Sequence, residues 1–241
     1  MFKINGEVFS KETLARKLDI SISRLDTTEA DVLATCEPAI KYNLHGCASE
    51  PIFIDLLVEA TKGTNVIPIS GIAMPRGGDD PKHLLMIAED YVKRGIKGFD
   101  TPLDICMIKD KKWDRALRYL RDLQSICEGA CLTNVVCEVD QLTQEEIATA
   151  AKIMGEAGVD NYKTSTGSTK RGPLPQDIMT IKANLSGKTG IMAASTGSFW
   201  TTQICMAFFV YGATVCSTRN AAAVIDGLDD FEAHYRMLEF V

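Results

Sequence analysis

Short apolar runs alternate with amphipathic stretches along almost the whole chain. Runs of apolar and β-branched residues predict strands, whereas apolar residues three or four apart predict helices. The predicted strands are Leu18–Ile22, Leu44–Ala48, Val66–Ser70, Gly98–Pro102, Leu132–Glu138, Asn161–Ser165, Gly190–Ala194 and Thr214–Ser217. The predicted helices are Glu29–Tyr42, Ile52–Ala60, Pro81–Arg94, Trp113–Cys127, Gln144–Glu156, Gln176–Asn184, Thr202–Tyr211 and Ala221–Leu238, the last broken near Gly227.

Eight strand–helix units follow one another at a spacing of about 20 to 35 residues, which favours a closed parallel (β/α)8 barrel. An open doubly wound sheet is the alternative, but the glycine-rich fingerprint that it favours after the first strand is absent. The 241 residues are close to the length of one barrel, about 250 residues, so a single domain over residues 1–241 is expected. Residues 1–17 precede the first strand, and we expect this N-terminal extension to form a helix at the bottom of the barrel.

Helix-end signals are clear before the sixth predicted strand. Thr143 is a good N-cap, and Glu146 three residues later completes a capping-box pattern. Gly155 and Gly158 close the helix, and Val159 leads into the strand. The segment around Lys163 is therefore predicted to run from a helix end through a turn into a strand and a glycine-containing loop.

Composition and charge narrow the class of protein. The net charge of −6 and the absence of a basic face argue against nucleic acid as a partner, although local cations can still hold an anionic substrate. The longest apolar run is too short to span a bilayer, and the N-terminus lacks the apolar segment of a secretory signal.

The eight cysteines lie mostly in apolar stretches, so buried reduced thiols in a cytoplasmic protein are expected. Cys127 and Cys131 lie four apart without further ligands at zinc spacing, so no metal is expected.

Lys163 is the strongest candidate for chemistry because it lies at the end of the sixth predicted strand, and barrel active sites form where strands end. A lysine that points into the barrel is desolvated, which lowers the pKa of an amine and leaves it able to attack a carbonyl. Position alone favours a lysine on a solvated strand end, because most lysines are exposed.

The next segment, residues 164–172, is rich in hydroxyl residues and glycine and ends in two cations. Backbone N–H groups of such a loop can bind a phosphate, although an ordinary flexible loop has a similar composition. Thr164, Ser165 and Gly167 are therefore candidate substrate or phosphate contacts.

The run Lys163-Thr164-Ser165-Thr166-Gly167 resembles the signature of the deoxyribose-phosphate aldolase family, in which this lysine forms the Schiff base. The resemblance extends from about Leu18 to Ala221. It implies a first-strand aspartate at Asp19, a second-strand cysteine at Cys47, the catalytic aspartate at Asp100 and a fifth-strand glutamate at Glu138. A (β/α)8 barrel that performs aldol chemistry without a cofactor is what the resemblance implies.

The sequence also departs from the family pattern. A second lysine near the Schiff-base amine is missing, since Met192 or Ala194 occupies its place and no lysine follows Lys188. Asn134 replaces a lysine of the fifth strand. The glycine pair after the seventh strand becomes Thr196-Gly197-Ser198, and the serine-rich phosphate loop becomes 217–220, which includes Arg219. Gly197 and Arg219 remain candidate phosphate contacts, Arg219 as a bidentate clamp for phosphate or carboxylate.

These features predict a class I aldolase for 2-deoxyribose 5-phosphate or a related sugar phosphate. Lys163 would be the nucleophile and Asp100 the proton shuttle, while Asp19 and Glu138 would orient water and the carbinolamine. The alternatives are an aldolase or transaldolase for another sugar and a non-catalytic sugar-phosphate-binding barrel, which the missing lysine favours. The resemblance also implies a homodimer or higher homo-oligomer.

Overall fold

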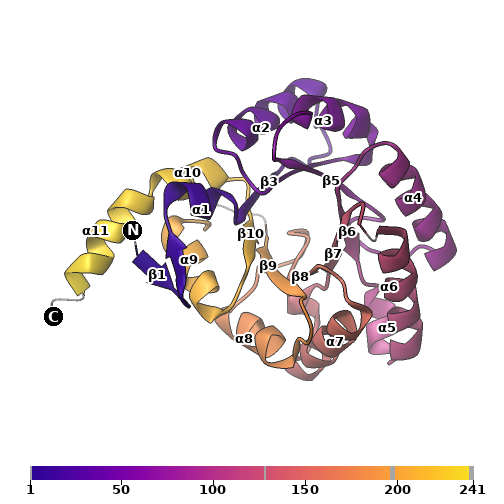
Figure 1. Ribbon diagram of the computed structural model, residues 1–241. Coiled ribbons are helices and arrows are strands. Elements are labelled where there is room, and N and C mark those ends of the chain that lie inside the picture. Colours follow the sequence, from indigo (N-terminus) through magenta and orange to yellow (C-terminus); the bar gives the residue numbers. More distant parts are fainter. Residues whose placement is uncertain (1, 128, 196–198, 239–241) are drawn as a thin grey trace.

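The structure, a computed structural model, describes residues 2–127, 129–195 and 199–238. Eight parallel strands close into a barrel in the order β10-β3-β4-β5-β6-β7-β8-β9, and the helices form a ring around it (Figure 1). The strands are β3 (Leu18–Ser21), β4 (Gly46–Ser49), β5 (Ile67–Gly71), β6 (Gly98–Pro102), β7 (Leu132–Val136), β8 (Asn161–Lys163), β9 (Gly190–Ala194) and β10 (Val215–Ser217). The predicted (β/α)8 fold is confirmed, and the alternative of an open sheet is wrong.

The helices of the ring follow the predicted apolar pattern closely. They are α2 (Glu29–Lys41), α3 (Ile54–Thr61), α4 (Pro81–Lys93), α6 (Trp113–Cys127), α7 (Gln144–Ala157), α8 (Pro175–Asn184), α9 (Thr202–Tyr211), α10 (Ala221–Asp226) and α11 (Leu228–Leu238). The break at Gly227 and the capping box of Thr143 and Glu146 are both confirmed, and Gly158 takes the left-handed conformation that ends α7. No helix within the described ranges is long and apolar enough to cross a bilayer.

Three short elements carry no clear periodic signal. The helix α5 (Ile105–Lys109) has only five residues and is capped by Asp104, and the 3-10 turns η1 (Pro51–Phe53) and η2 (Val139–Gln141) follow β4 and β7. Helices of one or two turns are held by tertiary packing, because too few residues are present for a hydrophobic period. These three elements therefore could not be predicted from the apolar pattern of the sequence.

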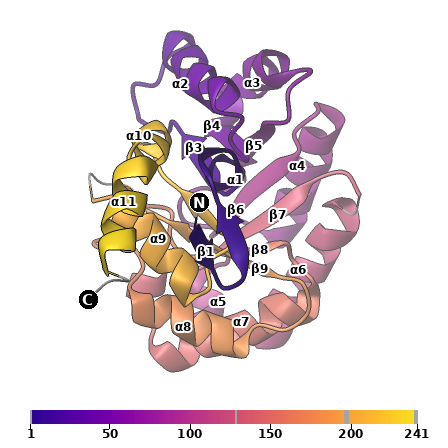
Figure 2. The same cartoon turned by 60° about the vertical axis from the view of Figure 1, so that its left-hand side comes forward.

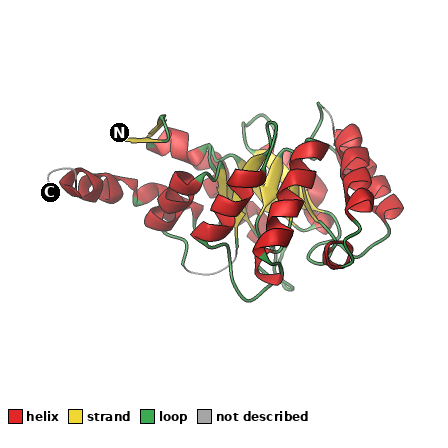
Figure 3. Ribbon diagram, turned by 90° about the horizontal axis from the view of Figure 1, so that it is seen from below, coloured by secondary structure: helices red, strands yellow, loops and turns green. Residues whose placement is uncertain are grey.

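The N-terminal extension is mostly a hairpin. Strands β1 (Phe2–Ile4) and β2 (Glu7–Phe9) pair antiparallel, and only α1 (Lys11–Ala15) has the helical conformation that was predicted for residues 1–17. The ring of Phe9 packs on Phe209 of α9 with centroids 5.3 Å apart. The hairpin of β1 and β2 lies on the side of the barrel where α11 projects (Figures 2 and 3).

The interior of the barrel contains a polar row that the strand register creates. Asp100 of β6 pairs with Asn134 of β7, and Asn134 pairs with Asn161 of β8. Two residues further along β8, Lys163 lies between Val136 of β7 and Met192 of β9. Because side chains alternate along a strand, Asn161 and Lys163 share a face and Tyr162 lies on the other.

Candidate active site

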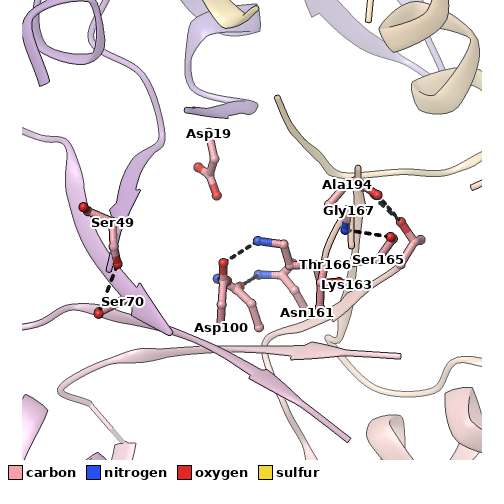
Figure 4. Close-up of polar contacts among 12 residues, drawn as sticks. Asp19, Ser49, Ser70, Asp100, Asn161, Lys163, Ser165, Thr166, Gly167 and Ala194 are labelled. Atoms are coloured by element: carbon pink, nitrogen blue, oxygen red, sulfur yellow. Dashed lines mark hydrogen bonds and ion pairs between the residues drawn. The ribbon is translucent and has the colours of Figure 1, made fainter. Parts of the chain in front are cut away.

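Lys163 ends β8 inside the barrel. Its side chain is 7% exposed, and its Nζ lies 2.5 Å from Oδ2 of Asp100, whose side chain is 11% exposed. A buried ammonium and carboxylate are each costly to desolvate, so the two groups meet as a bonded pair. The structure therefore brings together the predicted nucleophile and the predicted proton shuttle (Figure 4).

A chain of side-chain amides fixes the carboxylate of Asp100. Nδ2 of Asn134 donates to Oδ1 of Asp100 at 3.0 Å, and Nδ2 of Asn161 donates to Oδ1 of Asn134 at 2.9 Å. Both oxygens of Asp100 thus have a hydrogen-bond partner, and the side-chain oxygen of Asn134 accepts from Asn161. Such a row holds the carboxylate in one orientation beside the amine.

Asp19 is buried in β3 but does not join this row. Its Oδ1 lies 2.7 Å from Nδ1 of His45, which directly precedes β4. Its Oδ2 is buried and has no hydrogen-bond partner among the described residues. In Figure 4 the carboxylate points toward Lys163 and Asp100, without a bond to either. Burial lowers the pKa of His45, but the charge of Asp19 and its hydrogen bond outweigh burial, so the pKa of His45 is raised.

Glu138 organises the loop after β8. Its Oε1 accepts hydrogen bonds from the backbone N–H of Thr166 at 2.8 Å and from the Thr166 hydroxyl, and its Oε2 accepts one from Thr169. Glu138 does not line the cavity that contains Lys163. Its carboxylate is oriented toward residues 166–169, because that loop supplies the donors that a buried carboxylate needs. Positioning of the loop, rather than contact with a carbinolamine, is what this geometry supports.

A cavity of about 440 Å3 opens at the C-terminal end of the barrel, beside Lys163. Its polar lining includes Arg24, Glu50, Asp100, Lys163, Ser165, Thr166, Ser168, Ser195, Ser217 and Arg219, and its apolar lining includes Ile22, Leu25, Met74 and Pro75. Arg219 donates from Nη2 to the carbonyl of Ser23 at 3.0 Å, which anchors the guanidinium at the rim. Ser165 and Arg219, both predicted substrate contacts, therefore border the same cavity as Lys163.

Two other predicted loop contacts serve the backbone. The hydroxyl of Thr164 donates to the carbonyl of Ala194 at 3.2 Å and accepts from its N–H at 3.0 Å, so Thr164 ties β8 to β9. Gly167 has φ of 82°, where glycine is favoured, and its N–H donates to the hydroxyl of Ser165 at 2.9 Å. Neither residue lines the cavity, so they shape the loop rather than face a ligand.

Cys47, the second-strand cysteine that the resemblance implies, does not line the cavity. Its Sγ lies 3.8 Å from Sγ of Cys36 on α2, and its side chain packs in the core between strand and helix. Because Gly46 and Ala48 flank it on the inner face of β4, alternation orients Cys47 outward. The hydrogen bond with Cys36 and burial raise the pKa of the Cys47 thiol. Gly197 lies outside the described residues.

Several residues of the site were not singled out from the sequence. Asn134 appeared only as the replacement of a lysine, and Asn161 and His45 were given no role. A polar side chain on the inward phase of an otherwise apolar strand is the signal that marks Asn134 and Asn161. His45 carries no such signal, since in the predicted strand it shares the outward phase of Cys47, and its partner Asp19 is 26 residues away.

Comparison with known proteins adds independent evidence. The deoxyribose-phosphate aldolase of Histophilus somni strain 2336 is 30% identical over 222 residues, which cover 92% of this chain and 98% of that protein. The deoxyribose-phosphate aldolase of Geobacillus sp. strain WCH70 is 26% identical over 217 residues, covering 90% and 96% of the two chains. The solved tetrameric deoxyribose phosphate aldolase of Aeropyrum pernix gives a TM-score of 0.82 at 19% identity, over 92% of this chain and 93% of that one, which supports the fold. No family model matches the chain.

Proposed function

Since the chain belongs to the deoxyribose-phosphate aldolase family, we propose that it is a class I aldolase in which Lys163 forms a Schiff base. The proposed substrate is 2-deoxyribose 5-phosphate or a related sugar phosphate. The observation that carries this proposal is the contact of 2.5 Å between Nζ of Lys163 and Asp100 in the wall of the cavity. A nucleophilic amine and an acid–base group within hydrogen-bond reach are the arrangement that imine chemistry requires.

In the proposed reaction the neutral amine of Lys163 adds to the aldehyde carbon of the open-chain sugar. Loss of water from the carbinolamine gives an iminium ion. A base then takes the proton of the C3 hydroxyl, the C2–C3 bond breaks, and its electron pair moves into the iminium to give an enamine. A three-carbon phosphorylated aldehyde leaves at this point. Protonation of the enamine carbon and addition of water release acetaldehyde and regenerate the amine.

Asp100 is the residue that we assign to the proton transfers. It is the carboxylate bonded to Nζ, and Asn134 holds its second oxygen, so the carboxylate stays beside the reacting carbon–nitrogen bond. Asp100 accepts a hydrogen bond from Nζ of Lys163, and a protonated Nζ must lose a proton before the amine attacks. Transfer to a water molecule in the cavity provides that route, because the cavity is open to solvent at the barrel mouth.

For the substrate phosphate we propose the side of the cavity that carries Ser217 and Arg219. A guanidinium can bind a phosphate through two parallel hydrogen bonds. Nη2 of Arg219 is oriented by the carbonyl of Ser23, which leaves the planar group fixed at the rim. Arg171, one of the two cations that end the loop after β8, donates to Asp177 at 2.6 Å and so forms a structural ion pair.

Borohydride trapping tests the nucleophile. The wild-type protein with acetaldehyde and sodium borohydride should gain an ethyl group on Lys163, detected by peptide mass spectrometry. Lys163→Leu should not be modified at this position and should lose turnover, while Lys152→Leu, an exposed lysine of α7, should behave as wild type. Absence of an adduct on Lys163 in the wild type would refute the Schiff-base mechanism.

The substrate needs a second measurement. Cleavage of 2-deoxyribose 5-phosphate by untreated enzyme that is also trapped in the borohydride assay supports the proposed substrate. Trapping in that assay without cleavage by the untreated enzyme indicates an aldolase or transaldolase for another sugar. Binding of the sugar phosphate by a wild-type protein that is never trapped indicates a non-catalytic barrel.

We also propose that the chain forms a homo-oligomer. Leu25, in the loop after β3, and Ile52, in η1, are 112% and 81% exposed, and exposed apolar side chains of this size favour association. Light scattering coupled to size-exclusion chromatography tests this proposal, and a monomer at all concentrations would refute it.

A further inference from the structure

The pair of Asp19 and His45 has no part in the reaction described above, yet both side chains are largely buried and bonded to each other. The carboxylate of Asp19 is 2% exposed and the imidazole of His45 is 18% exposed, and Nδ1 lies 2.7 Å from Oδ1. A Cβ on Gly46, next to His45, would lie 2.8 Å from Oδ1 of Asp19. Glycine at this position therefore leaves the space that the carboxylate occupies.

The second oxygen of Asp19 is the unusual feature. Oδ2 is buried without a hydrogen-bond partner among the described residues, and in Figure 4 the carboxylate points toward Lys163 and Asp100. The barrel interior thus holds one carboxylate bonded to the amine and a second that is oriented toward it. In a medium of low dielectric constant, an anion favours the charged form of a nearby lysine even without direct contact.

We propose that His45 is a positioning residue that offsets the charge of Asp19, so that only Asp100 opposes the loss of the proton from Lys163. The inference rests on the proposed function, in which a neutral amine attacks the substrate. It also suggests how the site works without the second lysine that the family pattern has. A cation that neutralises an anion near the amine acts in the same direction as a cation placed beside the amine.

The charge of His45 depends on the groups that face it. Asp19 faces it from β3, and Arg16, which follows α1, lies nearby and donates to the carbonyls of Leu44 and Asn65. Burial and Arg16 lower the pKa of His45, but Asp19 raises it, and the net direction is upward. The imidazole therefore keeps its proton to a higher pH than an exposed histidine.

Competitive labelling of amines provides a direct test. Trace acetic anhydride is applied to the folded protein over a range of pH, and mass spectrometry of the Lys163 peptide gives the midpoint at which the amine becomes reactive. His45→Gln keeps a donor for Asp19 without the charge, and the midpoint should move upward by about 0.5–1 pH unit. His45→Lys restores a cation and should return the midpoint to the wild-type value or below. His83→Gln, an exposed histidine of α4, is the matched control.

A second pair of variants separates electrostatics from folding. In an Asp19→Asn background the anion is gone, so adding His45→Gln should leave the Lys163 midpoint unchanged. A midpoint that is the same in wild type and His45→Gln, with both proteins folded by circular dichroism, would overturn the inference. So would an equal upward shift in the Asp19→Asn background, because the effect would then not pass through Asp19.

The outcome for the proposed function is read separately, by borohydride trapping of the wild type. A shifted midpoint without any trapped adduct supports the effect of His45 on Lys163 and refutes the aldolase. A trapped adduct with an unshifted midpoint supports the aldolase and refutes the role of His45.

Discussion

The side-chain amide of Asn134 donates a hydrogen bond of 3.0 Å to Asp100 and leaves the other carboxylate oxygen to Lys163. The family pattern has a lysine at this position, so a neutral donor here replaces a cation. Of these two partners of Asp100, only Lys163 is an amine that can form an ion pair with it. The order of the site depends on this amide, because it also accepts from Asn161 and completes the row across three strands.

Replacing Asn134 by leucine should impair both activity and stability. The change leaves Oδ1 of Asp100 and Nδ2 of Asn161 buried without partners, at a cost of about 1–3 kcal/mol in the free energy of unfolding. We expect kcat to fall about 10–100-fold, since the carboxylate loses its fixed orientation. Denaturant unfolding and steady-state kinetics measure the two effects. Asn184→Leu, on α8 outside the barrel, is the control, and equal kinetic losses in both variants would contradict a specific role of Asn134.

Glu138→Gln should weaken the loop that borders the cavity. The carboxylate of Glu138 accepts hydrogen bonds at both oxygens. The amide of glutamine has one oxygen and one NH2 group, so the NH2 group would face a donor of Thr166 or Thr169 and one hydrogen bond would be lost. We expect KM to rise about 10-fold with a smaller change in kcat, because the loss of a hydrogen bond to a charged group costs about 1.5–3 kcal/mol. Glu145→Gln at the exposed start of α7 is the control. A fall in kcat at constant KM would instead indicate a direct part in chemistry.

Gly46→Ala should disturb the floor of the site. The added Cβ would lie 2.6 Å from Cδ1 of Ile69 and 2.8 Å from Oδ1 of Asp19, both closer than real Cβ contacts allow. We expect a loss of about 1–3 kcal/mol in the free energy of unfolding, the usual range for overpacking. Gly78→Ala meets open space and serves as the control in thermal unfolding. Wild-type stability in Gly46→Ala would show that Asp19 can move freely.

Arg219→Ala should affect phosphorylated substrates selectively. Loss of hydrogen bonds between a guanidinium and a phosphate is expected to raise KM about 10–100-fold, from about 1.5–3 kcal/mol. The same sugar without its phosphate should be cleaved equally by wild type and variant. Arg118→Ala, an exposed arginine of α6, provides the control. A similar loss with both sugars would place the phosphate elsewhere in the cavity.

The raised pKa of His45 predicts how stability depends on pH. The imidazole binds its proton more tightly in the folded chain than in the unfolded chain, because the charge of Asp19 outweighs the opposing effect of burial. Its contribution is therefore fully present below the unfolded pKa, about 6.5. It is lost as pH rises through the folded pKa. The stability difference between wild type and His45→Gln, from urea unfolding, should be largest near pH 6 and shrink as the pH rises through the folded pKa. A difference that grows with pH would reverse the assigned sign.

Most strands and helices of this fold could be predicted from the sequence, because the barrel consists of repeated local strand–helix units. Gly98–Pro102 and Gly190–Ala194 are strands with the predicted bounds, since each apolar run is short and ends at clear turn signals. The strand before Lys163 and the strand that contains it end earlier than predicted, at Val136 and Lys163. Glu138 and Ser165 were assigned to strands by their neighbours, but both lie beyond the last strand residue, where Glu138 accepts a hydrogen bond from Thr166 and Ser165 accepts one from Gly167.

For the site, the sequence determined which side chains end the strands, and hence that Lys163 and Asp100 could meet. The family pattern identified Asp19 and Glu138 as well, but only the tertiary structure decided what each carboxylate binds. Asp19 bonds to a histidine below β4, Glu138 bonds to the loop after β8, and Cys47 is oriented outward. The physical reason is that strand order follows from local pattern, whereas the partner of a buried polar group depends on register and on the space that residues distant in sequence leave open.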